Sequence, residues 1–155
     1  MSPASPNSPA PGTSARECVL VLHEDVGVSR LVREALETFT LAEVVTTPDA
    51  EYAFELALQR DYKLFVFHLN APILGGELLY ELISKAYRHC GAGYRKLPAV
   101  IYLGDAQDSL KYEELLRDAR VKGVLMKPLS IERLLDKAGS VLAKREDLHE
   151  GKSNV

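Results

Sequence analysis

Five polar residues stand directly after apolar runs, at positions where side chains could do chemistry. The run CVLVL is followed by His23, Glu24 and Asp25, the run LFVF by His68, and the run VLM by Lys127. Imidazoles and carboxylates can bind transition-metal ions, and imidazole changes its charge near neutral pH. These residues can act together only if the fold brings three separate segments of the chain to one place.

The segments around these residues alternate between strand and helix patterns. Strands are expected at 18–25, 43–47, 64–67, 99–103 and 124–126. Helices are expected at 29–39, after Pro48 and Asp49, and at 75–88, 108–120 and 130–142, the last with Ser130 as N-cap. The result is five βα units in sequence.

Apolar spacing assigns an inward face to the first and third of these helices. The residues expected to face the core are Leu31, Ala35, Leu36 and Phe39 in the first helix, and Leu78, Leu79, Leu82, Ile83 and Ala86 in the third.

Five βα units predict an α/β fold with a doubly wound parallel sheet and right-handed crossovers. Spacing alone leaves open whether the strand order is 2-1-3-4-5 or another doubly wound order. In either case the ends of the first and third strands border the point where the strand order reverses. We therefore expect His23, Glu24 and Asp25 to lie near His68, with Lys127 following the fifth strand.

The composition favours a soluble globular domain and gives no sign of a nucleic-acid-binding or membrane-spanning protein. The chain has 155 residues, 46% hydrophobic and 26% charged, which is ordinary for one soluble globular domain. A net charge of −3 gives no overall attraction to nucleic acid, and no stretch reaches the roughly 20 apolar residues that span a bilayer. The two cysteines, Cys18 and Cys90, do not suggest a disulfide framework, so a cytoplasmic location is expected.

Both ends of the sequence have the composition of tails. Residues 1–15 are rich in Pro and Ser and are expected to be disordered, and residues 144–155 are polar with mixed charge. Residues 16–143 are expected to form one domain. We expect no separate output domain, so any output would pass through a partner.

Four segments in order make the chain resemble the receiver domain of bacterial response regulators over about residues 17–143. They are CVLVLHEDVGVSRLVREALE, YKLFVFHLNAPILGGELL, LPAVIYLGD and VKGVLMKPLSIERLL. The resemblance implies a flavodoxin-like sheet of order 2-1-3-4-5. It also implies a cis peptide bond before Pro128.

The active positions of the family differ sharply in this chain. His68 stands where the family has its phospho-acceptor aspartate, and His23 and Glu24 stand where it has two metal-pocket acids, followed by Asp25. Gly104, or Leu103 in a shifted alignment, takes the place of the switch hydroxyl. The aromatic switch position falls at Val124, and only Lys127 with its following proline is kept.

These replacements predict a degenerate phosphorylation pocket, because the family binds Mg²⁺ through oxygen ligands and imidazole is a poor substitute. The expected function is a stand-alone pseudo-receiver: a protein interaction module in two-component-type signalling that works without phosphorylation, enzymatic activity or a cofactor. The partner is unknown. The resemblance points to homodimerisation through the fourth helix, fifth strand and fifth helix. No nucleic-acid or membrane partner is expected.

Several alternatives stay open. His23, Glu24 and His68 could bind Zn²⁺ or Ni²⁺, or could be partly solvated polar residues at strand ends. His68 could accept a phosphoryl group, the histidine cluster could sense pH, or the strand-end crevice could serve an enzyme. Lys127 is expected to pair with Glu24, Asp25 or both.

The basic loop after the third helix is a further alternative. Arg88, His89, Arg95 and Lys96, with tyrosines between them, could contact nucleic acid, although a solvated connection is favoured.

Overall fold

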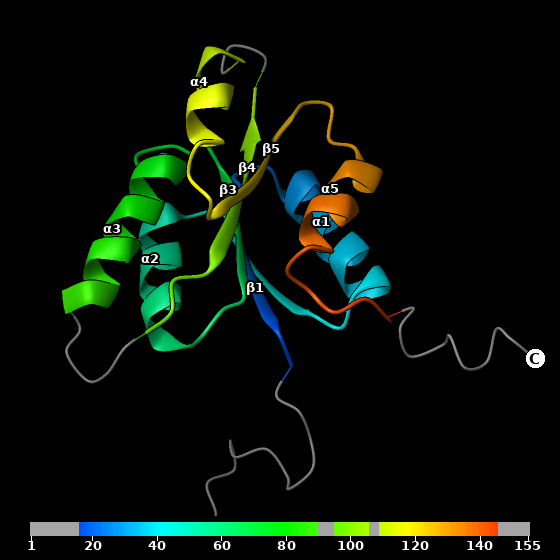
Figure 1. Cartoon of the computed structure of the whole chain (residues 1–155), viewed down its shortest axis with the longest axis horizontal. Helices are drawn as coiled ribbons and strands as arrows, with labels where there is room; N and C mark the ends of the chain where they lie inside the picture. The colour runs from blue at the N-terminus through cyan, green and yellow to red at the C-terminus, as the bar shows by residue number, and fades with distance from the viewer. Residues whose placement is uncertain (1–15, 90–94, 106–108, 146–155) are drawn as a thin grey trace, which may run out of the picture.

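Five short strands form one parallel sheet in the computed structural model, which describes residues 16–89, 95–105 and 109–145 (Figure 1). The strands are β1 (Cys18–Leu22), β2 (Glu43–Thr47), β3 (Leu64–His68), β4 (Ala99–Gly104) and β5 (Val121–Met126). Their order is β2-β1-β3-β4-β5, and every neighbouring pair is parallel. This confirms the predicted flavodoxin-like fold.

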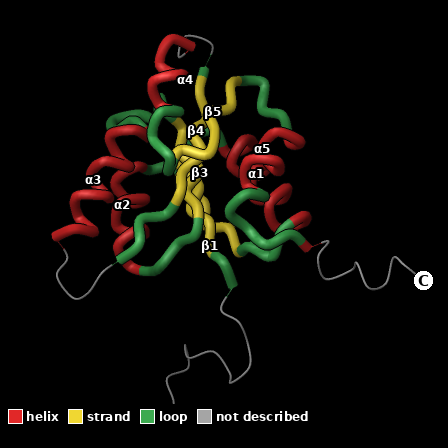
Figure 2. Tube along the Cα trace, viewed as in Figure 1, coloured by secondary structure: helices red, strands yellow, loops and turns green. Residues whose placement is uncertain are grey.

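Helices cover both faces of the sheet, as Figure 2 shows. They are α1 (Val26–Phe39), α2 (Ala50–Gln59), α3 (Gly76–His89), α4 (Ser109–Leu115) and α5 (Ile131–Ala138). Helices α1 and α5 pack on one face, and α2 and α3 pack on the other, with Leu115 of α4 joining the core of the second face. Because both faces are covered, the central strands are apolar on both sides.

The two faces have different cores. The face under α1 and α5 is aliphatic, with Val19, Val21, Leu36 and Leu134 at its centre. The face under α2 and α3 contains the buried aromatic side chains, which are Tyr62, Phe65, Phe67, Tyr80, Tyr87 and Tyr102.

Two helices are shorter than their patterns predict. Helix α4 ends at Leu115 rather than near residue 120, because the amides of Arg117 and Asp118 bond carbonyls only three residues back and tighten the chain into turns. Helix α5 ends at Ala138, and Gly139 caps it. Its N-cap is Ser130, whose side chain accepts from the Arg133 amide, as predicted.

The inward faces of α1 and α3 were predicted only in part. Leu31 and Phe39 in α1 and Leu78 and Leu82 in α3 are exposed rather than buried. The buried stripe of α1 is centred on Ser29, Val32, Ala35 and Leu36.

In α3 Leu79 and Ile83 are buried as predicted, and two tyrosines not predicted to face inward are buried beside them. Tyr80 and Tyr87 donate hydrogen bonds of 2.6 Å to the carbonyls of Pro98 and Ala57, and these bonds set the rotation of the helix.

Two glycines let α3 begin directly against the end of β3. A Cβ atom at Gly76 would lie 2.6 Å from the carbonyl oxygen of His68, and one at Gly75 would lie 2.6 Å from that of Leu69. No side chain fits at these distances. The close approach holds the end of β3, and with it His68, under the start of the helix.

Several predicted features lie outside the described residues. These are the N-terminal tail 1–15, residues 90–94 of the basic loop, Cys90 and residues 146–155. At the described end of the chain, Lys144 forms an isolated bridge with Thr40, and Arg145 donates to the carbonyl of Glu37.

Candidate functional site

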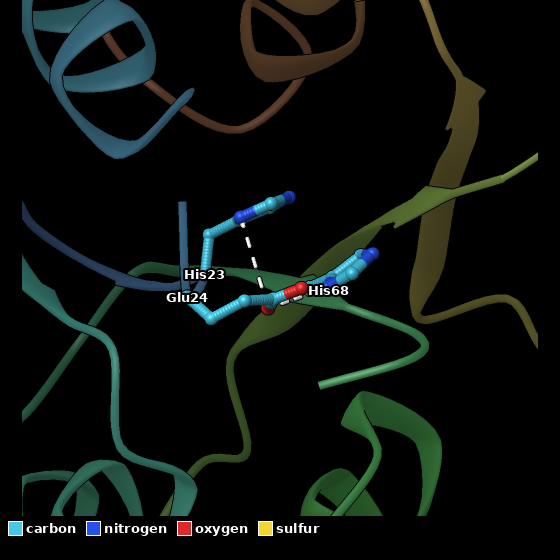
Figure 3. A group of neighbouring side chains, drawn as sticks. All are labelled: His23, Glu24 and His68. Carbon is cyan, nitrogen blue, oxygen red and sulfur yellow. Dashed lines mark hydrogen bonds and ion pairs between the residues drawn. The ribbon is translucent and has the colours of Figure 1, made fainter. Parts of the chain in front are cut away.

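Strand register places the two histidines side by side. Leu22 of β1 lies opposite Phe67 of β3, so the next residues, His23 and His68, emerge together at the carboxyl edge of the sheet. Their rings stack with centroids 4.1 Å apart and an interplanar angle of 19°. The structure therefore brings His23, Glu24 and His68 together, as the sequence predicts (Figure 3).

Both imidazoles are buried. His23 is 1% exposed and His68 is 2% exposed, so the interpretation of them as partly solvated residues is wrong. Each ring covers one face of the other by stacking, and Gly76 of α3 and Ser29 of α1 lie against the backbones of His68 and His23. Histidines of this kind belong to the core, where an unpaired polar atom is costly.

Hydrogen bonds assign the proton on each ring. The Asp25 amide donates to Nδ1 of His23 over 2.9 Å, so neutral His23 carries its proton on Nε2. Nδ1 of His68 lies 2.8 Å from Oε2 of Glu24; an ionised carboxylate only accepts, so His68 donates from Nδ1. The Nε2 atoms of both rings are buried without a hydrogen-bond partner.

Glu24 joins the two rings at the mouth of the site. Its side chain is 37% exposed, and its Oε2 lies 3.8 Å from Nδ1 of His23 as well as 2.8 Å from Nδ1 of His68. Burial opposes ionisation of Glu24, but hydrogen bonds from its own backbone and from His68 outweigh it and lower its pKa. Burial, followed by the charge of His68, lowers the pKa of His23. Ionised Glu24 therefore faces a neutral His23.

Lys127 pairs with a residue that the sequence analysis did not include in the site. Gly104 of β4 lies opposite Met126 of β5, so Asp105 and Lys127 leave the sheet side by side. Lys127 Nζ lies 3.2 Å from Oδ1 of Asp105. The expected pairing of Lys127 with Glu24 or Asp25 is wrong, because β5 lies beside β4, and β3 and β4 separate it from β1.

Asp105 also approaches the histidines. Its Oδ2 accepts from the Asn70 side chain over 3.1 Å and lies 3.8 Å from Nε2 of His68. The hydrogen bond from Lys127, then that from Asn70, lowers the pKa of Asp105. Its position directly after β4 was the available signal for this residue, because the carboxyl edge collects the residues that follow each strand.

The remaining site candidates have structural roles. Asp25 is exposed and is the N-cap of α1, accepting from the amides of Gly27 and Val28. Gly104 is the buried last residue of β4 and supplies no hydroxyl. The Lys127–Pro128 peptide bond is cis.

Arg95, from the basic loop, is engaged inside the protein. Its guanidinium bonds the Leu58 carbonyl over 2.9 Å and the Asp61 carboxylate over 3.0 Å, and it lies over the Tyr87 ring. These contacts give Arg95 a structural role.

This arrangement differs chemically from a magnesium pocket. Mg²⁺ prefers an octahedral shell of oxygen atoms, whereas two of the three clustered residues here present nitrogen. Their ligand atoms lie within 4.8 Å of one another. Imidazole with carboxylate is a donor set for late first-row cations.

The helices were compared with the length and apolar character of membrane-spanning segments. Across residues 16–89, 95–105 and 109–145, none has both the length and the apolar character that crossing a bilayer demands.

Comparison with known proteins identifies the fold. No family model matches the chain, and no curated protein matches it in sequence. Similar solved structures include a receiver domain from Clostridium thermocellum (17% identity, TM-score 0.66, 80% of this chain and 92% of that one) and the receiver domain of the Francisella response regulator 1452 (21%, 0.66, 81% and 95%). Chemotaxis response regulator CheY4 of Vibrio cholerae is another (23%, 0.63, 83% and 100%). The chain has the receiver-domain fold of two-component signalling proteins.

Proposed function

We propose that this protein is a non-enzymatic interaction module of two-component-type signalling that works in the cytoplasm without phosphorylation. The observation that carries the proposal is His68, a buried imidazole at the end of β3, where the receiver resemblance expects a phospho-acceptor carboxylate. The fold supports a place in signalling, and the replaced residue supports a lost phosphotransfer reaction.

The local chemistry disfavours phosphorylation of His68 itself. Nδ1 already donates to Glu24, and Nε2 is buried, so neither nitrogen is an exposed nucleophile. Position 104 is glycine, so the end of β4 offers no hydroxyl to a phosphoryl group.

The partner surface that we propose comprises α4, β5 and α5. Leu110 on α4 is 94% exposed, and Leu116, just after the helix, is 38% exposed. Lys122 and Arg133 on β5 and α5 are exposed too, so the surface combines apolar and charged groups. Such a mixture suits a reversible protein contact, including one with a second copy of this chain.

The proposal is tested by mass and by sedimentation. The protein is incubated with Mg²⁺ and acetyl phosphate, with an acidic-pocket receiver as positive control, and its intact mass is measured. We expect no phosphoryl adduct and the same sedimentation coefficient with and without the donor. A stable adduct, or self-association that depends on the donor, would contradict the proposal.

The surface is tested with two matched substitutions. Leu110→Lys is expected to weaken self-association of the chain, or its binding to a protein partner. Ile73→Lys, at a 92% exposed position on the β3–α3 loop, is expected to leave this association unchanged. Equal effects of the two substitutions would exclude α4 from the interface.

A further inference from the structure

The cluster of His23, Glu24 and His68 has the atoms of a metal site already gathered at one edge of the sheet. Oε2 of Glu24 lies 2.8 Å from Nδ1 of His68 and 3.8 Å from Nδ1 of His23. The three ligand atoms lie within 4.8 Å of one another, and Figure 3 shows the carboxylate joined to both rings. We propose that these three residues bind a zinc-class divalent cation, a property separate from the proposed partner binding.

The hydrogen-bonding state of His23 already suits coordination through Nδ1. A neutral imidazole binds a metal through its unprotonated nitrogen, and His23 carries its proton on Nε2. Its Nδ1 lone pair accepts from the amide of Asp25, an exposed residue at the start of α1. Coordination therefore replaces one hydrogen bond near the surface.

His68 reaches the matching state by moving its proton from Nδ1 to Nε2. Its Nε2 now has no hydrogen-bond partner, and Oδ2 of Asp105 lies 3.8 Å away. With the proton on Nε2, a small movement lets His68 donate to this carboxylate while Nδ1 faces the ion. A carboxylate that accepts from the far nitrogen is the usual support of a metal-binding histidine.

The stacked rings must turn for their lone pairs to converge on one ion. Neither Nε2 atom has a hydrogen bond to lose, so the turn breaks the hydrogen bonds at the two Nδ1 atoms and the stacking contact between the rings. The buried Nε2 atom of His68 without a hydrogen-bond partner also points to a ligand, because coordination through Nδ1 together with the Asp105 contact would satisfy both nitrogens of this ring.

Charge favours a divalent cation. The carboxylates of Glu24 and Asp25 interact with His23 and that of Asp105 with His68, and Lys127 is a cation near both. Two neutral imidazoles and one carboxylate select Zn²⁺, Ni²⁺ or Cu²⁺ over Mg²⁺. Glu24 stands at the partly exposed mouth and gives the ion a route from solvent.

Calorimetric titration of the chelator-treated full chain with ZnCl₂ tests the site. We expect one ion per chain, and we expect Glu24→Gln, His23→Gln and His68→Gln each to weaken binding at least about tenfold. The matched control carries His89→Gln and His149→Gln, which removes the other imidazoles of the chain and should leave the affinity unchanged. Circular dichroism verifies folding, and Glu24→Gln remains decisive if a buried histidine variant unfolds, because Glu24 is partly exposed.

Cobalt substitution identifies the donor atoms. Co²⁺ at this site should give visible d–d bands without a thiolate charge-transfer band. Cys18 is the first residue of β1, whereas His23 follows its last residue, so the Cys18 thiol lies at the other end of the strand. Absence of stoichiometric zinc binding, loss of binding in the His89→Gln/His149→Gln control, or unchanged affinity in Glu24→Gln would each overturn the proposal.

Discussion

Buried polar groups are treated differently in two parts of the molecule. Under α2 and α3, the hydroxyls of Tyr80 and Tyr87 donate to backbone carbonyls at 2.6 Å. At the carboxyl edge of the sheet, His23 and His68 are at least as buried, yet one nitrogen of each ring has no hydrogen-bond partner. Tyr80 and Tyr87 connect elements of the fold, whereas both histidines, like the Tyr62 hydroxyl in the aromatic core, leave bonding capacity unused.

Buried groups that form hydrogen bonds stabilise the fold, whereas buried groups without partners are candidates for a function. A paired buried hydroxyl contributes to folding, while a buried polar atom without a partner costs free energy that stability alone does not explain. Open α/β folds place their ligand sites at this edge of the sheet, and the proposed zinc site would use the same two imidazoles. Substitutions in one region at a time test this difference.

The largest expected effect comes from the tyrosines that bridge elements. Tyr80→Phe and Tyr87→Phe should each lower the free energy of unfolding by about 1–3 kcal/mol, because each leaves a buried carbonyl without its donor. Urea unfolding followed by circular dichroism measures the change.

Tyr62→Phe is the matched control within the same core. The Tyr62 hydroxyl is buried without a hydrogen-bond partner, so its removal should change the free energy of unfolding by no more than about 0.5 kcal/mol. Equal losses in all three variants would mean that hydroxyl pairing does not distinguish these positions.

A smaller effect is expected at the edge of the sheet. In chelator-treated protein, His68→Leu should change the free energy of unfolding by less than about 1 kcal/mol, since it removes an unpaired Nε2 and frees Glu24 to be hydrated. The same urea experiment measures it. A loss above about 2 kcal/mol would show that the His68–Glu24 bond stabilises the fold as much as the tyrosine hydrogen bonds do.

A further expected difference concerns alkaline pH. Burial raises the pKa of Tyr62 to about 12, whereas an unfolded tyrosine titrates near 10. Between these values the unfolded chain loses a proton that the folded chain keeps, so the free energy of unfolding falls as pH rises through this window.

Tyr62→Phe removes this contribution. Urea midpoints measured at about pH 9 and about pH 11 should therefore fall less in Tyr62→Phe than in the wild type. An equal or steeper fall in the variant would contradict the burial of a protonated Tyr62.

Much of the fold was predictable from local patterns. Alternating apolar runs and amphipathic segments correctly predict five βα units, and Ser130 is recognisable as an N-cap from its type and place. Helix rotation was harder. Tyr80 and Tyr87 face inward because their hydroxyls reach carbonyls distant in the sequence, and spacing contains no information about those partners.

The cluster of His23, Glu24 and His68 was predictable, but Asp105 and the partner of Lys127 were not. His23, Glu24 and His68 follow strands whose ends meet, so their proximity follows from the order of elements. The partner of Lys127 depends on which strand lies beside β5, and the sequence analysis therefore paired it with the wrong acids.

The amino-acid sequence by itself determined which residues follow each strand, because apolar runs and their endings are local properties of the chain. Only the tertiary structure decided that both imidazoles are buried, that their Nε2 atoms have no hydrogen-bond partner, and that Asp105 joins them. Burial and pairing depend on strand register and on how helices close over the sheet, and these arise from contacts between residues far apart in the chain.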